Sequence, residues 1–313
     1  MSSVSRFFNL KIKGRFSSFF VALLRLGFIS GVSFIILHPL LTKLSSSLMQ
    51  ERDLFDQTVI WISRTPTLEH FFLAWEHMNY PVAFFNSFTL SFVVSILQLI
   101  SCTLVGYGLA RFEFKGSAVI FGLVIFTLVV PPQMIMIPLY LNFRFFNLFG
   151  ILGEEGFNLL GSYWPYVLTS LTSTGLRNGL FIYIMRQFFK GMHRDLEEAA
   201  YVDGAGLFKT FMTIMLPGAL PGLVIVFLFA FVWTWNDYFF MTLFIGGRGE
   251  FMTQALDGLA LRALKGDHNR LGGNYASLIN NTGSLMFIAP LLFLYSIMQR
   301  YFIESVERTG LVG

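Results

Sequence analysis

The sequence has few charged residues and only one cysteine. Asp, Glu, Lys and Arg make up 13% of the 313 residues, whereas a soluble domain needs about a quarter to cover its surface. This shortage excludes both one large soluble domain and a pair of small ones. The lone Cys102 excludes an intrachain disulfide bond. Hydrophobic residues reach 55% of the chain and include 38 phenylalanines, which is typical of a membrane protein.

Charge-free segments indicate where the chain crosses the membrane. They cover residues 26–42, 78–110, 116–143, 156–176, 210–236 and 271–299. A spanning helix needs about 20 apolar residues, and the first segment becomes long enough when the run from Phe16 is added across Arg25. No small-x-small cleavage site follows this run, so we expect a retained helix rather than a signal peptide.

Backbone in contact with lipid must satisfy its own hydrogen bonds, so these segments are expected to be helices. We therefore predict an all-α, polytopic integral membrane protein with about six transmembrane helices, forming one domain over residues 1–313. The predicted spans are about 16–41, 83–110, 117–141, 163–189, 218–245 and 277–301.

Basic residues favour one orientation of these spans. With the N-terminus inside, the predicted cytoplasmic segments carry net positive charge and the outer segments net negative charge. Both termini are therefore predicted to be cytoplasmic. The overall net charge of +4 reflects this topology and gives no support for nucleic-acid binding. A long outer segment, residues 246–275, is Gly-rich with mixed charge and is predicted to be partly irregular.

The predicted cytoplasmic loop 190–217 has the most specific pattern. Asp195 is placed to cap a helix, with Glu198 at the third helical position. Gly204 fits a left-handed helix stop, and a second helix is predicted over residues 207–216. On spacing alone, a solvated amphipathic hairpin that joins two spans explains the pattern equally well.

The same loop resembles the EAA loop of permease subunits in binding-protein-dependent ABC importers. The matching residues are Glu198-Ala199-Ala200, Gly204 after three more residues, and Ile214-x-Leu216-Pro217 after a further nine. Asn86-Ser87, the segment 107–112 and Trp235-Asn236-Asp237-Tyr238 are similar to the carbohydrate branch, most of all to the maltose-type subunit with a short N-terminus. The resemblance extends from the second span to the C-terminus and implies the type I ABC importer permease fold with a sugar or oligosaccharide as substrate. The segment 256–275 and the tail 304–313 depart from the family pattern, so the sugar is not specified.

The resemblance implies that the EAA loop, residues 190–217, docks into a separate ATPase. Glu198 is the implied charged anchor, although it can also cap its own helix. The implied docking residues are Glu197, Glu198, Ala199, Ala200, Asp203, Gly204, Ala205, Ile214, Leu216 and Pro217.

The implied partners are a second permease in a heterodimer, a pair of ABC ATPase subunits and an extracytoplasmic solute-binding protein, in the cytoplasmic membrane of a bacterium or archaeon. The chain has no G-x-x-x-x-G-K-[ST] phosphate loop, no metal-ligand spacing of His and Cys, and no nucleophile elbow. We therefore expect that it is not an enzyme and holds no cofactor, with ATP and Mg bound by the partner ATPase.

Polar groups at membrane depth are candidates for the substrate path, because burying them in lipid is costly. Arg177 lies between Gly175 and Gly179 and either lines the path at a helix break or pairs structurally with an acid. Aromatic faces with nearby amides and carboxylates suit a sugar, but they also describe an aromatic belt at the outer interface. The candidates are Gln133 after a predicted kink at Pro131-Pro132, Arg177, Trp233, Trp235, Asn236, Asp237 and Asn281.

Two other classes of protein remain open at this point. An ion-coupled secondary transporter needs an acid deep within a span, and only Asp237, near the outer edge, comes close. A membrane scaffold without transport needs neither an ATPase nor a substrate path. Co-purification of the chain with an ATPase, together with loss of that ATPase's activity when the EAA loop is mutated, would distinguish the three classes of protein.

Overall fold

The computed structural model describes residues 2–147, 150, 156–175, 177–247, 250–265 and 274–310, with side chains from residue 19 to residue 301 within these ranges. Throughout this described part the regular elements are helices, and the only β feature is an isolated bridge between Phe146 and Phe157. The prediction of an all-α chain is therefore confirmed.

The chain divides into two compact units. Unit 1 comprises Met1–Ala74 and Ala260–Leu285, and unit 2 comprises Trp75–Leu259 and Met286–Gly313. Three described helices, α2 (Glu69–His77), α14 (Leu259–Ala263) and α16 (Tyr275–Gly310), contribute to both units. The single domain expected from the sequence stays a prediction.

Unit 1 is built around α1 (Ser2–Ser47), which contains an apolar stretch of 29 residues, Phe19–Ser47. A short 3-10 helix, η1 (Glu51–Phe55), and α14 from Ala260 onward belong to its remaining segments. The amide of Asn281 joins α16 to the end of α1: its Oδ1 accepts from Lys43 Nζ at 3.0 Å, and its Nδ2 donates to Ser46 Oγ at 3.0 Å.

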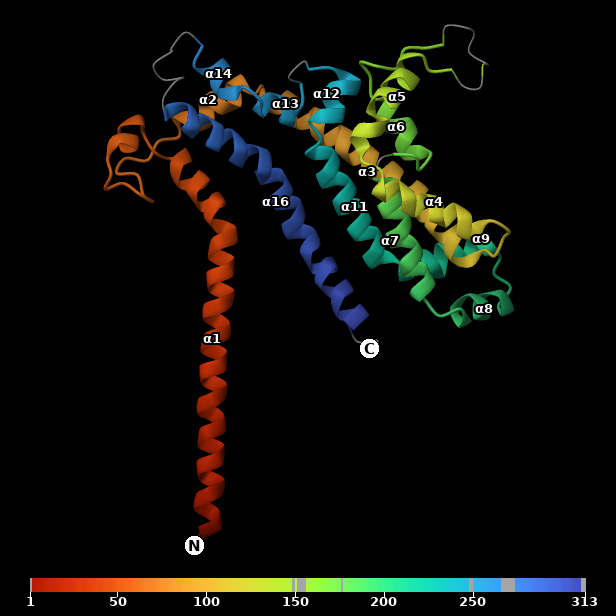
Figure 1. The fold of residues 1–313 in the computed structure, drawn as a ribbon, viewed down its shortest axis with the longest axis horizontal. Coiled ribbons are helices and arrows are strands. Elements are labelled where there is room, and N and C mark those ends of the chain that lie inside the picture. Colours follow the sequence, from red (N-terminus) through yellow and green to blue (C-terminus); the bar gives the residue numbers. More distant parts are fainter. Residues whose placement is uncertain are drawn as a thin grey trace. The chain divides into compact units, whose positions relative to one another are not determined.

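Unit 2 is organised around α3 (Tyr80–Arg111). The helices α6 (Trp164–Leu171), α7 (Asn178–Gly191) and α11 (Leu220–Trp235) pack against α3, and α4 (Ser117–Val129) packs against α7 (Figure 1). Gly106 explains the close approach of α3 and α7, because a Cβ there would lie 2.7 Å from Met185 Cβ. On another face of α3, Phe88 and Phe92 make edge contacts with Phe231 and Phe227 of α11.

Several predicted spans are broken rather than continuous. The third span is two helices, α4 and α5 (Pro132–Arg144), bent by 104° at the predicted Pro131-Pro132 kink. The fourth is α6 and α7, separated by a break that holds Ser173 at φ +57°. The fifth is α11 followed by α12 (Phe239–Ile245). Proline lacks the N–H that continues a helix, which accounts for the first break.

By length and composition, three described helices could cross a membrane, or up to five if each bent pair counts as one span. These three are α1, α3 and α16, at the predicted positions of spans one, two and six. The full set of six spans stays a prediction. In the segment 246–275, which the sequence predicts to lie outside, the structure places α13 (Met252–Leu256) and α14, and residues 248–249 and 266–273 are not among the described residues.

Candidate functional site

The EAA loop begins with α8 (Asp195–Val202). The N–H groups of Glu197 and Glu198 donate to the Arg194 carbonyl at 2.9 and 3.1 Å, so Arg194 is the N-cap residue. The prediction that Asp195 caps this helix is therefore wrong, because the first turn starts one residue earlier. The three acids at positions 195, 197 and 198 still lie in that turn, where negative charge is favourable.

The end of α8 is a left-handed turn, as predicted. Gly204 has φ +79°, and the N–H of Ala205 donates to the Ala200 carbonyl at 2.9 Å. The predicted second helix runs from Leu207 to Gly218. It consists of α9 (Leu207–Thr210), the π-helical stretch η2 (Phe211–Met215), which contains Ile214, and α10 (Leu216–Gly218), which contains Leu216 and Pro217.

Glu197 points inward and joins α8 to the end of α3. Its Oε2 lies 3.2 Å from Arg111 Nε, and its Oε1 accepts a hydrogen bond from Tyr107 Oη at 2.9 Å. Arg111 also donates from Nη2 to the Met192 carbonyl at 2.8 Å. The side chains of Arg111 and Glu197 are only 5% and 9% exposed. Removing one partner of such a buried pair leaves an uncompensated charge, so this contact fixes the loop on α3.

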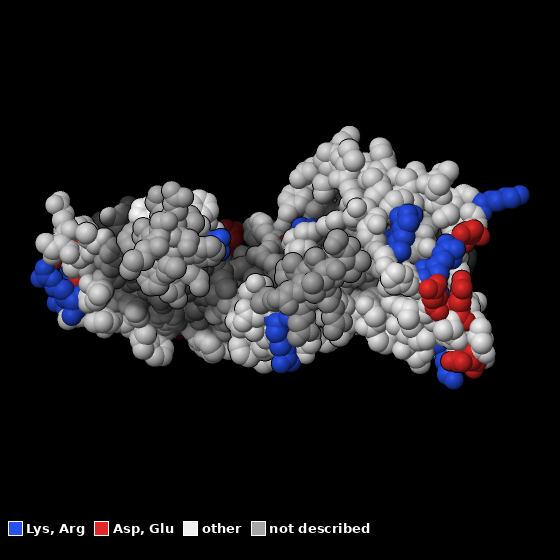
Figure 2. Space-filling model, turned by 90° about the horizontal axis from the view of Figure 1, so that it is seen from below, with Lys and Arg blue, Asp and Glu red and all other residues white. Residues whose placement is uncertain are grey.

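The opposite face of α8 is exposed. Glu198, Ala199 and Asp203 are accessible, whereas Ala200 is buried against the body of unit 2. Exposed apolar side chains lie beside these acids, with Val202 at 88% and Phe208 at 75%. Figure 2 shows blue and red side chains gathered over the region of unit 2 that contains α8. The loop therefore presents a mixed acidic and apolar surface to any partner.

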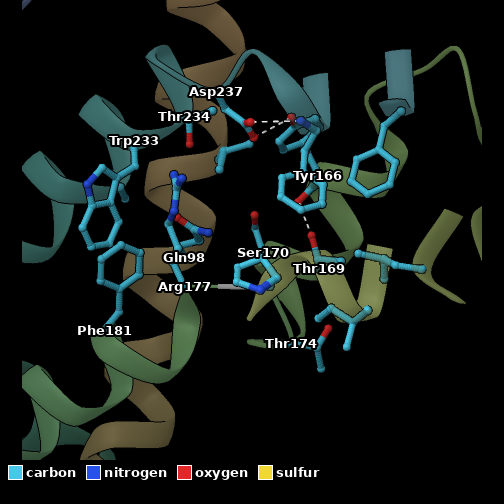
Figure 3. Close-up of a pocket in the computed structure, with 18 residues that line it drawn as sticks. Gln98, Tyr166, Thr169, Ser170, Thr174, Arg177, Phe181, Trp233, Thr234 and Asp237 are labelled. Atoms are coloured by element: carbon cyan, nitrogen blue, oxygen red, sulfur yellow. Dashed lines mark hydrogen bonds between the residues drawn. The ribbon is translucent and has the colours of Figure 1, made fainter. Parts of the chain in front are cut away.

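A second candidate site is a cavity of about 110 Å³ within unit 2 (Figure 3). Its wall comes from α3, α5, α6, α7, α11 and α12 and from the breaks between them. Aromatic faces line it together with polar side chains. The polar lining residues are Gln98, Tyr166, Thr169, Ser170, Thr174, Arg177, Thr234 and Asp237.

Arg177 is the N-cap residue of α7, and its guanidinium Cζ lies 5.1 Å from the centre of the Trp233 ring. This is the geometry of a cation–π contact. Trp233 also stacks with Phe181 and with Phe229, at centroid distances of 5.6 and 5.4 Å. In the described part of the chain, no carboxylate lies within 4 Å of the guanidinium.

Asp237 lies in the link between α11 and α12. Its Oδ2 accepts from Tyr166 Oη at 2.9 Å, and its Oδ1 accepts from the Phe240 N–H at 3.1 Å (Figure 3). Trp233 near the end of α11 and Asp237 in the link after it both line the cavity. The cavity therefore contains one acid with both oxygens bonded and one cation without a bonded acid.

The other sequence candidates lie elsewhere. Trp235 is fully buried, stacks on Phe231 and donates from Nε1 to the Phe287 carbonyl at 3.3 Å. Asn236 is exposed and donates to the Val232 carbonyl of its own helix at 2.7 Å. Gln133 is exposed at the start of α5, and Asn281 belongs to unit 1.

The sequence analysis missed several lining residues, above all Gln98. This residue is the side-chain amide nearer the middle of α3, Asn86 being the other one in that helix, and an amide at that depth was the available signal. Tyr166, Thr169 and Ser170 gave no comparable signal, because hydroxyl residues are frequent in these spans.

Comparison with known proteins decides the class. Residues 102–308 match the family described as the binding-protein-dependent transport system inner membrane component. The chain belongs to this family. The predicted importer permease is thereby confirmed, against an ion-coupled transporter or a scaffold.

Relatives cover most of the permease. The chain is 29% identical to the arabinooligosaccharides transport system permease protein AraQ of Halalkalibacterium halodurans, and the alignment covers 93% of this chain and 96% of that protein. It is 28% identical to the alpha-glucoside transport system permease protein AglG of Rhizobium meliloti, over 82% of this chain but only 64% of that protein.

A solved structure supports the fold. A chain of a bacterial ABC transporter involved in the import of the acidic polysaccharide alginate superposes with a TM-score of 0.67 at 19% identity, covering 91% of the permease and 98% of that chain. At this identity the likeness concerns the fold alone, and it agrees with the predicted permease architecture.

Proposed function

We propose that the permease forms, with a second permease subunit, the membrane pathway for a sugar or oligosaccharide. An extracytoplasmic solute-binding protein delivers the substrate, and a pair of ATPase subunits supplies the energy through the EAA loop. The observation that carries this proposal is the two-sided α8, with Glu197 fixed inward on Arg111 and Glu198 and Ala199 exposed on the other face.

The exposed face of α8 suits a helix-in-groove contact with an ATPase. Glu198 supplies the charged anchor, and the small Ala199 allows close approach. Val202 and Phe208 add apolar area that is in contact with water in the isolated chain. ATP and Mg bind to the partner, so the permease itself is not an enzyme and carries no cofactor.

The link from the EAA loop to the cavity runs through α3. Tyr107 and Arg111 hold Glu197 at one end of this helix, and Gln98 lines the cavity nine residues before Tyr107. That separation is about 13 Å at 1.5 Å per residue. A rigid-body movement of α8 driven by the ATPase therefore changes the wall of the cavity. Substrate biases the same equilibrium according to its affinity for the two states.

The cavity supplies the chemistry that a sugar needs. The faces of Trp233 and Phe181 can stack on the C–H face of a pyranose, and the Gln98 amide and Asp237 can bind hydroxyl groups. The relatives named for arabinooligosaccharide and alpha-glucoside transport support a carbohydrate substrate. Arg177, Trp233 and Asp237 are the substrate-path residues we favour.

We place the permease in the cytoplasmic membrane of a bacterium or archaeon, with both termini and the EAA loop in the cytoplasm. The distribution of basic residues supports this orientation. Cysteine accessibility on either side of the membrane, with probes at Glu198 and at Thr58, tests it.

Co-expression with the candidate partners tests the proposed function. The complete assembly should take up labelled oligosaccharide in an ATP-dependent way, and omission of the ATPase should abolish uptake. Uptake that is driven by an ion gradient and independent of the ATPase contradicts the proposal.

A further inference from the structure

Arg177 is the only cation among the described residues that line the cavity, and Asp237 is the only anion. We infer that the cavity binds a sugar unit that carries a carboxylate, a uronic acid, through the Arg177 guanidinium. This inference rests on the proposed function and names the substrate class of the same site.

The two charges of the cavity differ in their hydrogen bonding. Asp237 accepts from Tyr166 and from the backbone of Phe240, so both of its oxygens are occupied. Arg177 has five N–H donors, and within the described chain none of them is paired with an acceptor side chain or carbonyl. Each Asp237 oxygen thus accepts one hydrogen bond from the protein and can accept another from a hydroxyl group, whereas the N–H groups of Arg177 have no acceptor within the described residues.

A carboxylate matches this free group better than a hydroxyl does. A guanidinium can bind both oxygens of a carboxylate through parallel hydrogen bonds, and such charge-assisted bonds are about twice as strong as neutral ones. The cation–π contact with Trp233 keeps the guanidinium at the cavity, since the indole itself packs against Phe181 and Phe229. The geometry thus favours a planar anion at this position.

Neighbouring groups suit the sugar ring that carries this anion. The Gln98 amide and the Thr234 hydroxyl line the cavity and make no side-chain hydrogen bond within the described residues. Figure 3 shows the side chains of Gln98, Thr234 and Arg177 among those that line the cavity with Trp233. A uronic acid can place its carboxylate on Arg177 and its hydroxyl groups on Gln98 and Thr234.

A matched pair of ligands tests the inference. Methyl β-D-glucuronide and methyl β-D-glucoside differ only by a carboxylate in place of CH₂OH. Saturation-transfer NMR on the full permease, purified in lipid nanodiscs with the subunits that accompany it, measures weak binding of each. We expect the glucuronide to bind at least about tenfold more tightly, since a hydrogen bond to a charged group is worth that much.

Three variants test whether Arg177 causes the preference for the glucuronide. Arg177→Gln should remove the preference for the glucuronide, and Arg177→Lys should retain part of it because the charge remains. Arg144→Gln is the matched control: Arg144 also lies over an aromatic ring, 5.6 Å from the centre of Phe145, but it does not line the cavity. The control should bind both glycosides as the unmodified chain does.

The opposite results overturn the inference. These are equal binding of the two glycosides, no binding of either, or an unchanged preference in Arg177→Gln. Displacement of the glucuronide by an equal concentration of acetate also overturns it, because that result identifies a simple anion site. The inference is also overturned if Arg177→Gln releases the second permease and the glucuronide is not preferred. That result would show that Arg177 pairs with an acid of the second permease. Failure of ATP-dependent uptake by the complete assembly is a separate result that concerns the proposed function.

Discussion

Arg111 at the end of α3 and Glu197 in α8 form a buried ion pair, with Nε and Oε2 3.2 Å apart. Tyr107 completes the contact from one turn earlier on α3. An EAA loop that was merely a solvated hairpin would not need a buried charge pair to the body of the protein. Because of this ion pair, the EAA loop and α3 are expected to move together as one rigid body.

Breaking this pair should uncouple ATP hydrolysis from transport. Glu197→Ala leaves Arg111 buried without its partner, which costs about 3 kcal/mol or more, so α8 should no longer move with α3. We expect the ratio of sugar transported to ATP hydrolysed to fall several-fold in proteoliposomes. The exposed pair between Glu113 and Arg194, also 3.2 Å apart, is the control, and Glu113→Ala should leave the ratio unchanged. An equal loss in both variants contradicts the role assigned to Glu197.

Substitutions on the exposed face of α8 should weaken association with the ATPase, rather than uncouple ATP hydrolysis from transport. Glu198→Ala removes the proposed anchor, and Gly204→Asp forces a side chain into a backbone with φ +79° that favours glycine. Both variants should insert at normal abundance but lose the ATPase on co-purification. Normal transport in both would reject the docking assignment.

The two polar residues at the end of α11 should behave differently. Asp237→Asn removes a charge that Tyr166 and Phe240 hold at the cavity, so sugar uptake and substrate-stimulated ATP hydrolysis should fall together while basal hydrolysis stays near normal. Asn236→Ala should have a smaller effect, because Asn236 bonds only to its own helix. If Asp237→Asn cripples basal hydrolysis, the residue is structural.

Gly106 should be intolerant of any side chain. Gly106→Ala places a Cβ 2.7 Å from Met185 Cβ and 3.0 Å from the Arg186 backbone nitrogen, so α3 and α7 must separate. We expect a loss of about 1–3 kcal/mol in the free energy of unfolding, measured as a lower thermal midpoint in detergent. Gly108→Ala, whose nearest neighbour would be 3.9 Å away, is the control and should keep the midpoint.

Sequence reasoning located the long apolar helices, the kink at Pro131-Pro132 and the turn at Gly204, because each depends on local chemistry. It did not separate Glu197 from Glu198, since only tertiary packing decides which of two adjacent acids faces Arg111. It also grouped Trp233 with Trp235, although residues two apart on a helix point to nearly opposite sides. Trp233 and Asp237 line the cavity, whereas Trp235 belongs to the core. Gln98 was missed because it lies far from these residues in the sequence.

The surface between α3 and α7 has a consequence for gating. At the C-terminal end of α3, Arg186 donates to the Leu109 carbonyl at 3.3 Å, and Arg111 is bonded to Met192 and Glu197. Farther along, α3 presents small residues to α7: Cys102 lies 3.8 Å from the Asn178 carbonyl oxygen, and a Cβ on Gly106 would lie 2.7 Å from Met185 Cβ. A movement of α8 therefore reaches α3 at this bonded end, and the expected response is a tilt of the helix about that end. Val94, on the cavity wall, lies about 25 Å from Arg111 along the helix, so a tilt of about 5° moves it by about 2 Å, enough to narrow or widen a passage for one sugar ring.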